Sequence, residues 1–377
     1  MEAQIEKGLV VEECDEDNEM IEWVKRAHGK GVIDRAGAAL VDWWESDFDE
    51  MKDFEAWSSA MDVVQNWRSC HALPLNVVQK GLRDRARKIE PKVIIAQRLK
   101  RFPSIMNKLA REPVMKLSQM HDLGGCRAIL SNVKKVYALY EAYRGTAGTS
   151  LLLPEGASLK CYDYITNPKD DGYRGIHVVA RYHPRIPSRE SWDGHRVEIQ
   201  LRTTVQHAFA TAVETVTTFT RQPLKFHAGP PEWRRFFSLM GSALAIRENT
   251  ALVPGTPTDH TALIAELRCA AGDLLVRQRL EAWANSIHTL PMRDLKNFKW
   301  LLLVLDTNQN SISVTGYIDR NDASKNLTEI EKEKRPEIDA VLVWVNSIKG
   351  LRTAYPNYYA DTKQFLSILD SMLSDEK

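Results

Sequence analysis

The sequence lacks several features that would place a protein outside the cytoplasm. No apolar run approaches the roughly 18 residues that a membrane-spanning helix requires. The first residues, MEAQIEKGLVVEECDEDNEM, have neither the basic start nor the apolar middle of a signal peptide. The five cysteines are scattered along 377 residues without a Cys-x-x-Cys pair, which argues against a disulfide framework and against a zinc knuckle. These absences predict a reduced, cytoplasmic protein that does not associate with a membrane.

Net charge is also nearly absent, at +1, but the charges are segregated along the chain. Residues 11–19 and 44–56 are acidic, whereas residues 80–111 are rich in lysine and arginine, opposed only by Asp84 and Glu90. Such a basic run is either a solvated helix face or a site for polyphosphate or nucleic acid, because a basic field concentrates anions.

The order of apolar patterns predicts an α+β fold in two parts. Residues 1–111 favour helices, broken at Pro74 and Pro91, and strand and helix patterns then alternate as far as residue 219. The segment VPGTPTD, 253–259, is the best candidate linker. Beyond it we expect a helical stretch, a β-hairpin, a helix, a strand and a final helix. We therefore expect a mixed β-sheet domain flanked by helices over 1–250, with a helical N-terminal extension, and a small α+β domain over 259–377.

The segment VEIQLR, 197–202, reads as a strand with different side chains on its two faces. Its period of two places three apolar side chains on one face and Glu198, Gln200 and Arg202 on the other. That polar face is either an ordinary solvated strand or one wall of a site. A second acid, Asp122, precedes Gly124-Gly125 and another apparent strand. Asp122 and Glu198 together would supply the two carboxylates that Mg²⁺ requires beside a phosphate substrate.

The stretch QRLKRFPSIMNKLARE, 97–112, combines groups that bind phosphate chains. Pro103 suits the first turn of a helix, which would place Ser104 and Lys108 one turn apart on the same side. Arg98 and Lys100 precede them on an extended segment. Helix N-terminal amides, a hydroxyl and several cations of different reach are the donors that phosphates prefer.

The loop KDDGYRG, 169–175, has an aromatic ring between a glycine and an arginine, with His177 just behind it. A surface turn uses the Asp-Gly pair but gains nothing from an exposed Tyr173. A loop that binds a flat, charged ligand gains ring stacking, cationic donors and a backbone that can approach closely.

Four motifs in this order resemble the RelA/SpoT synthetase domain over about residues 60–225. They run from Arg98 to Leu109, from Asp122 to Arg127, from Asp163 to His177 and from Val197 to Thr203. The resemblance implies a mixed sheet flanked by helices, related to nucleotidyltransferases. It also implies an ATP-dependent pyrophosphokinase, which transfers the β,γ-pyrophosphate of ATP to a ribose 3′-hydroxyl and releases AMP.

The resemblance also implies roles for single residues. ATP would be bound by Arg98, Lys100, Ser104 and Lys108. Mg²⁺ would be held by the catalytic carboxylates Asp122 and Glu198, and Glu198 would also accept the proton of the attacking hydroxyl. The acceptor would be stacked by Tyr173 and oriented by Lys169, His177, Gln200 and Arg202.

The C-terminal segment TAYPNYYADTKQFL holds Tyr355 and Tyr358, which suit either a core-facing aromatic turn or a regulatory segment. A Tyr-x-x-Tyr after a strand, in a small domain without zinc ligands, resembles the CapRel-type fused toxin–antitoxin synthetases. In that family a pseudo-zinc-finger domain occludes the ATP site until a phage capsid protein binds. The resemblance implies an autoinhibited toxin in antiviral defence, which pyrophosphorylates the 3′ end of tRNA and blocks translation.

Two alternatives to the tRNA-modifying toxin stay open. One is a (p)ppGpp synthetase that acts on GDP or GTP, and the other is an inactive binding module that keeps the fold. Asp122, Glu198, Arg98, Lys100 and Lys108 are all present, which disfavours the inactive module. A tRNA acceptor would require basic surface beyond the pocket, and the cluster Arg83, Arg85, Arg87 and Lys88 could supply it or could be a plain helix face.

Overall fold

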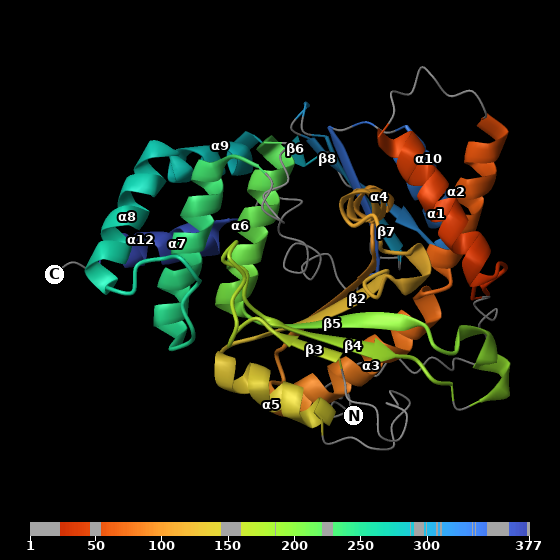
Figure 1. Ribbon diagram of the computed structural model, residues 1–377, viewed down its shortest axis with the longest axis horizontal. Helices are drawn as coiled ribbons and strands as arrows, with labels where there is room; N and C mark the ends of the chain where they lie inside the picture. The colour runs from red at the N-terminus through yellow and green to blue at the C-terminus, as the bar shows by residue number, and fades with distance from the viewer. Residues whose placement is uncertain are drawn as a thin grey trace, which may run out of the picture.

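In the part of the chain that it describes, the computed structural model has two β-sheets, three groups of helices and one further helix beside the second sheet (Figure 1). It describes residues 23–45, 54–144, 160–184, 186–220, 229–286, 288–289, 298, 300–306, 308–309, 311–333, 335, 337–344 and 362–374. Within these residues the expected α+β fold is confirmed.

The first sheet is mixed and has five strands in the order β1-β2-β5-β4-β3. The strands are β1 (Ile94–Leu99), β2 (Gly124–Leu130), β3 (Lys160–Asp163), β4 (Ile176–Arg181) and β5 (Arg196–Thr203). The central pair β2 and β5 is parallel, and the other three pairings are antiparallel. Every expected strand between residues 124 and 203 is present.

Two helices cover one face of this sheet, α3 (Ala72–Ile89) and α5 (Val133–Arg144), which lie beneath it in Figure 1. Val197, Ile199 and Leu201 of β5 are fully buried in the core that the sheet forms with these helices. The alternation along the strand turns Glu198, Gln200 and Arg202 to the opposite face. That face points toward α4 (Phe102–Arg111) and the second sheet.

The N-terminal helices α1 (Lys30–Glu45) and α2 (Phe54–Ser69) pack with α4 around a second core. The expected helix break lies before Pro74 and not at it, because α2 ends at Ser69 and α3 begins at Ala72. Pro74 occupies the first turn of α3, where backbone N–H groups have no acceptor within the helix, so the N–H that proline lacks is not needed there. The break near Pro91 is confirmed, but the expectation of helices throughout residues 1–111 is wrong, because Ile94–Leu99 form strand β1, which pairs with β2.

The second sheet has the order β6-β8-β7-β9 and contains the expected hairpin. Its elements are β6 (His288–Thr289), β7 (Trp300–Asp306), β8 (Ser311–Tyr317), α10 (Arg320–Lys332) and β9 (Ile338–Trp344). Buried Leu302, Leu327 and Ala340 join this sheet to α10.

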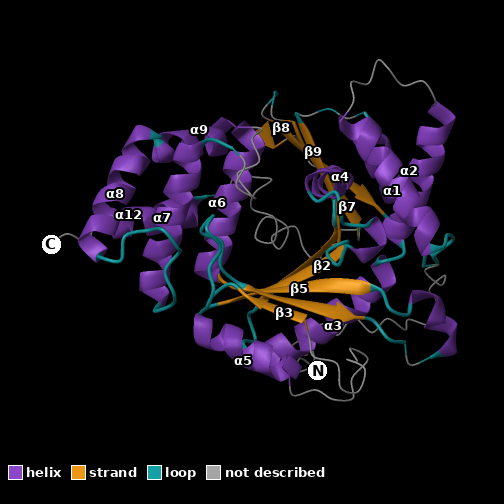
Figure 2. Ribbon diagram, viewed as in Figure 1, coloured by secondary structure: helices purple, strands orange, loops and turns teal. Residues whose placement is uncertain are grey.

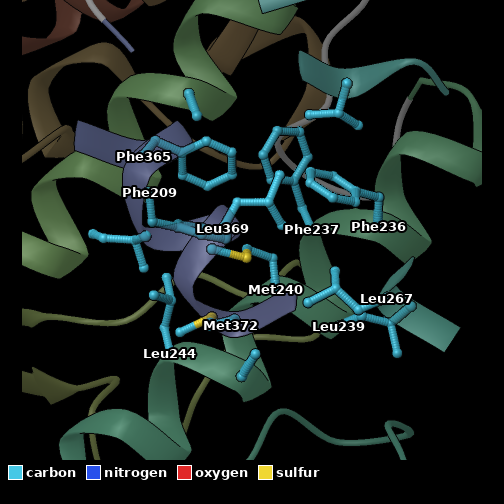
Figure 3. Close-up of a cluster of buried hydrophobic side chains, with 14 of the residues drawn as sticks. Phe209, Phe236, Phe237, Leu239, Met240, Leu244, Leu267, Phe365, Leu369 and Met372 are labelled. Atoms are coloured by element: carbon cyan, nitrogen blue, oxygen red, sulfur yellow. The ribbon is translucent and has the colours of Figure 1, made fainter. Parts of the chain in front are cut away.

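The third group contains five helices that share one apolar core (Figures 2 and 3). They are α6 (Thr204–Thr220), α7 (Pro231–Glu248), α8 (His260–Asp273), α9 (Val276–Ser286) and α12 (Lys363–Ser374). Phe365 and Leu369 of α12 pack against Phe236 and Phe237 of α7 (Figure 3). The segment 253–259 does connect α7 to α8, but helices on both sides of it bury their side chains in the same core. The division into domains 1–250 and 259–377 stays a prediction.

Among the described residues, none of the helices has both the length and the apolar character that crossing a membrane requires.

Because α12 completes a core shared with α6 and α7, its apolar side chains should matter to the whole helical group. We expect Phe365→Ala to lower the free energy of unfolding by about 3–5 kcal/mol, the usual cost of emptying an aromatic core site. Lys363→Ala on the same helix is the control, because Lys363 is exposed. Urea unfolding followed by near-UV and far-UV circular dichroism measures both. A separate early transition that leaves the signal of the remaining chain unchanged would contradict a shared core.

Candidate active site

The polar face of the first sheet collects side chains from neighbouring strands at one level. Glu198 of β5 lies opposite Gly125 of β2, and Gly125 lies opposite Arg98 of β1. Gln200 lies opposite His177 of β4. The register therefore brings together residues that are about 100 positions apart in the sequence.

Five side chains on this face form a closed ring of hydrogen bonds, namely those of Tyr173, His177, Glu198, Gln200 and Arg202. Glu198 Oε1 lies 3.1 Å from His177 Nδ1, and His177 Nε2 lies 2.5 Å from Tyr173 Oη. Arg202 Nε donates to Tyr173 Oη at 3.1 Å, and Arg202 Nη2 donates to Gln200 Oε1 at 2.8 Å. Gln200 Nε2 closes the ring by donating to Glu198 Oε2 at 2.6 Å. Each member thus fixes the rotamer of the next.

Glu198 is an ionised carboxylate in a buried position, with 8% of its surface exposed. Burial alone would raise its pKa, but the charge and hydrogen bond of His177 and the hydrogen bond of Gln200 lower the pKa well below its usual range. A carboxylate with such a low pKa is ionised, and so can ligate a hard cation, but it is a weak proton acceptor.

Asp122 lies just before β2 and is held by two lysines. Lys100 Nζ lies 2.9 Å from Asp122 Oδ2, and Lys108 Nζ lies 3.1 Å from Asp122 Oδ1. Burial raises the pKa of Asp122, but the charges of the two lysines outweigh it and leave the pKa below its ordinary value. His121 Nε2 lies 4.0 Å from Glu198 Oε1, and the charge of Glu198 acts to raise the pKa of Asp122, so the two carboxylates border one site.

Asp122 and Glu198 fit a divalent metal by the chemistry of their donors, because Glu198 is buried, Asp122 is half-buried, and both are ionised carboxylates that offer oxygen ligands. The lysines that now neutralise Asp122 are two of the cations expected to bind ATP. Ser104 follows on the first turn of α4, partly exposed, with Pro103 before it. The structure therefore places the expected phosphate-binding and metal-binding groups side by side.

The aromatic wall of the site is larger than the sequence suggested. Tyr173 lies edge-on to Tyr164, with ring centroids 5.9 Å apart, and Tyr164 stacks on Tyr162 at 6.0 Å. Lys169 Nζ lies 4.4 Å from the centre of the Tyr164 ring. Tyr162 and Tyr164 were not among the expected site residues, although their spacing of two in CYDYIT would have indicated a common side of the strand.

The loop around Tyr173 is shaped by its contacts with α7. Gly172 has a φ of 85°, and a Cβ on it would lie 2.3 Å from the carbonyl oxygen of Phe237, so only glycine fits. Asp171 Oδ1 accepts a hydrogen bond from Tyr173 N at 3.0 Å. Arg174 is buried in an ion pair with Glu248 at 2.9 Å, and so it supports the loop from behind.

Two further expectations concerned the basic cluster of residues 83–88 and the C-terminal tyrosines. The basic cluster Arg83, Arg85, Arg87 and Lys88 belongs to α3, which packs on the face of the sheet opposite the polar ring. That position favours a plain helix face over a nucleic-acid surface adjoining the site. Tyr355 and Tyr358 lie outside the described residues, so their regulatory role stays a prediction.

Comparison with known proteins places the site within a recognised region. Residues 97–222 match the family model described as "Region found in RelA / SpoT proteins". The matched stretch contains every residue expected to bind ATP, metal or acceptor. The resemblance to the RelA/SpoT synthetase domain is therefore confirmed for this part of the chain.

Particular relatives are similar over parts of their length. The GTP pyrophosphokinase YwaC of Bacillus subtilis is 30% identical over 112 residues, which are 28% of this chain and 49% of the relative. The chain thus spans about half the length of that curated relative. Small alarmone synthethase 1 from Bacillus subtilis bound to its product pppGpp aligns at 20% identity, covering 49% of this chain and 94% of that one, with a TM-score of 0.39. Small alarmone synthethase 2 from Bacillus subtilis gives 20% identity, coverage of 52% and 95%, and a TM-score of 0.39.

The ion pairs of Asp122 predict a pH-dependent contribution to stability. Its pKa is lowered by folding, so the contribution is complete above the unfolded pKa near 3.9 and is lost as the pH falls through the folded pKa. We expect Asp122→Asn to lower the free energy of unfolding by roughly 1–3 kcal/mol at pH 7, because two lysines lose their partner. The difference from wild type should shrink below about pH 4. Urea titrations at pH 7 and pH 3 measure it, with the exposed Asp170→Asn as control. An equal cost at both pH values would contradict the ion-pair explanation.

Proposed function

We propose that the chain is an ATP-dependent pyrophosphokinase. The acceptor hydroxyl attacks the β-phosphorus of ATP, the bond between that phosphorus and the oxygen bridging to the α-phosphate breaks, and AMP leaves. The proton of the attacking hydroxyl passes to a side chain of the site or to a water molecule. The observation that supports this most directly is the meeting of Lys100, Lys108 and two ionised carboxylates on one face of the sheet. Phosphoryl transfer depends on such positioning and charge compensation and needs little covalent chemistry from the protein.

Asp122 and Glu198 would hold Mg²⁺, which when bound would neutralise developing charge on the phosphate oxygens. Lys100 and Lys108 would then turn from Asp122 to the phosphates. Glu198, with its lowered pKa, suits the role of metal ligand better than that of proton acceptor.

We propose the 3′ end of tRNA as acceptor, with its terminal base stacked on the aromatic wall. Tyr162, Tyr164 and Tyr173 supply ring faces and edges, and Lys169 supplies a cation beside them. Stacking tolerates any base. A guanine nucleotide is therefore the second candidate, and the similarity to a relative named GTP pyrophosphokinase favours it.

We further propose that the C-terminal part of the chain inhibits the site and that a partner protein, such as a phage capsid protein, releases it. The support is a contact at the N-terminus of α4. Glu331 of α10 accepts a hydrogen bond from the amide of Phe102 at 3.0 Å and forms a buried ion pair with Arg68 at 2.8 Å. Arg101, which precedes α4, pairs with Asp339 of β9. The Glu331 carboxylate thus accepts a hydrogen bond from an amide at a helix N-terminus, a kind of donor that phosphates prefer.

The same contact gives a prediction for control. The double variant Glu331→Gln/Asp339→Asn removes both charges while keeping side-chain size. Breaking a buried pair costs about 3–5 kcal/mol, which would raise the undocked population more than tenfold. We expect the initial rate of pyrophosphate transfer by the full chain to rise accordingly. Glu329→Gln on the same helix is the control, because Glu329 is exposed and, among the described residues, pairs with its helix neighbour Lys332. A lower rate in the double variant would show that docking supports the site.

The reaction itself is tested in the full chain, because truncation after α7 would uncover the shared helical core. The Glu331→Gln/Asp339→Asn protein is incubated with γ-labelled ATP and Mg²⁺, with GDP or GTP in one tube and deacylated tRNA in another. We expect label on one acceptor and a loss of at least 100-fold with an added Glu198→Gln, since a metal ligand is removed. The exposed Glu190→Gln is the control. Equal transfer by the Glu198→Gln protein would contradict the proposed site, and label on guanine nucleotide would replace tRNA as the acceptor.

A further inference from the structure

A second cluster of chemically active side chains lies outside the site described above. Cys70 lies between α2 and α3, His71 directly precedes α3, and His195 directly precedes β5. All three are buried, and one ligand atom from each lies within 4.8 Å of the others. No motif in the sequence predicts a metal site here, because there is no Cys-x-x-Cys pair and His195 is about 125 positions from Cys70.

Hydrogen bonds fix which nitrogen of each ring is free. His71 Nδ1 lies 2.7 Å from the carbonyl oxygen of Trp67, and His195 Nδ1 lies 2.8 Å from that of Trp192. A carbonyl oxygen only accepts, so each Nδ1 carries the proton and each Nε2 presents its lone pair. His195 Nε2 lies 3.1 Å from Cys70 Sγ. Backbone carbonyls hold metal-ligating histidines in the same way.

The two rings are also in the protonation state that binds metals. Burial lowers the pKa of His71 to about 3, and burial likewise lowers that of His195 to about 4. Both rings are therefore neutral at physiological pH, and neutral imidazole is the ligating form.

The cluster borders a cavity of about 250 Å³. His71 and His195 form part of its wall, together with the charged side chains of Arg26, Lys30, Arg181, Asp193 and Arg196. Three protein ligands beside an accessible cavity are typical of a zinc site with one open position. The surplus of cations in the wall would favour an anion, such as hydroxide or phosphate, in that position.

We propose that Cys70, His71 and His195 bind one Zn²⁺ ion, with the fourth coordination position facing this cavity. Burial raises the pKa of the Cys70 thiol to about 12, so zinc binding would release its proton to solvent. The resulting thiolate with two imidazoles suits zinc in ligand type and number. Zinc bonds of about 2.3 Å to sulfur and 2.0–2.1 Å to nitrogen at tetrahedral angles would separate Cys70 Sγ from His195 Nε2 by about 3.5 Å. The present separation of 3.1 Å needs only a small opening.

Zinc here would act on the fold around the first site and not on its chemistry. It would join the turn between α2 and α3 to the residue three positions before Glu198. His71 also packs under β2, since a Cβ on Gly124 would lie 3.6 Å from His71 Cβ. The ion would thus tie the N-terminal helices to both central strands. This proposal is independent of the proposed enzymatic activity.

The test uses the full chain, incubated with excess ZnCl₂ and then dialysed against metal-free buffer. We expect about one zinc per chain by elemental analysis and a raised Tm relative to chelator-treated protein. Replacement by Co²⁺ should give the intense near-ultraviolet absorption of a thiolate–cobalt bond. The variants Cys70→Ser and His195→Gln should each lose the bound zinc and that absorption. Cys269→Ser, at an exposed position in α8, should keep both.

The wild-type protein alone can overturn the proposal, whether or not the variants fold. A chain that retains no zinc after dialysis, or a cobalt form without thiolate absorption, would do so. If Asp122 and Glu198 held the metal, the cobalt form would lack thiolate absorption, because those ligands are oxygens. Full zinc occupancy in Cys70→Ser would also overturn it.

Discussion

The parallel pairing of β2 with β5 is the constraint on which the other parts of the structure depend. It lies at the centre of the five-stranded sheet, and it sets Gly125 beside Glu198 and Arg127 beside Gln200. A shift of one residue would turn Glu198 toward α3 and α5, where it would be buried among apolar side chains. The apolar contacts of Val197, Ile199 and Leu201 with those helices therefore hold the polar groups in register on the other face.

The polar ring on that face is stable because each member forms hydrogen bonds with two others. Isolated burial of Glu198 or Arg202 would be costly, but the ring supplies each with hydrogen bonds from neighbours that are themselves held in place. Asp122 is neutralised separately by Lys100 and Lys108. The site thus holds more cations than carboxylates, and an anionic ligand that binds there has to exchange one set of ion pairs for another.

Sequence reasoning reached those features that depend on short-range patterns. Period-two alternation identified the polar face of β5, and the Pro-Ser spacing located the start of α4. The same alternation would also have revealed Tyr162, had it been applied to β3. Long-range contacts could not be found in this way. Nothing near Arg174 indicates that it would be buried against Glu248, and nothing near Glu331 indicates a contact with Arg68 some 260 residues earlier. Such contacts depend on how whole elements pack, which one sequence does not specify locally.

The core shared by α6, α7, α8, α9 and α12 has a consequence for how the protein is made. A ribosome releases the chain from its N-terminus, and segments fold as they emerge. The five strands and the polar ring are synthesised first, but α6 and α7, which flank them, keep an exposed apolar face until α12 leaves the ribosome. Completion of the sheet's support is therefore coupled to the synthesis of α12. A nascent chain that lacks α12 would carry the groups of the site on an unfinished scaffold. Because α10 and β9 precede α12, the elements that dock on α4 are synthesised before this scaffold is complete.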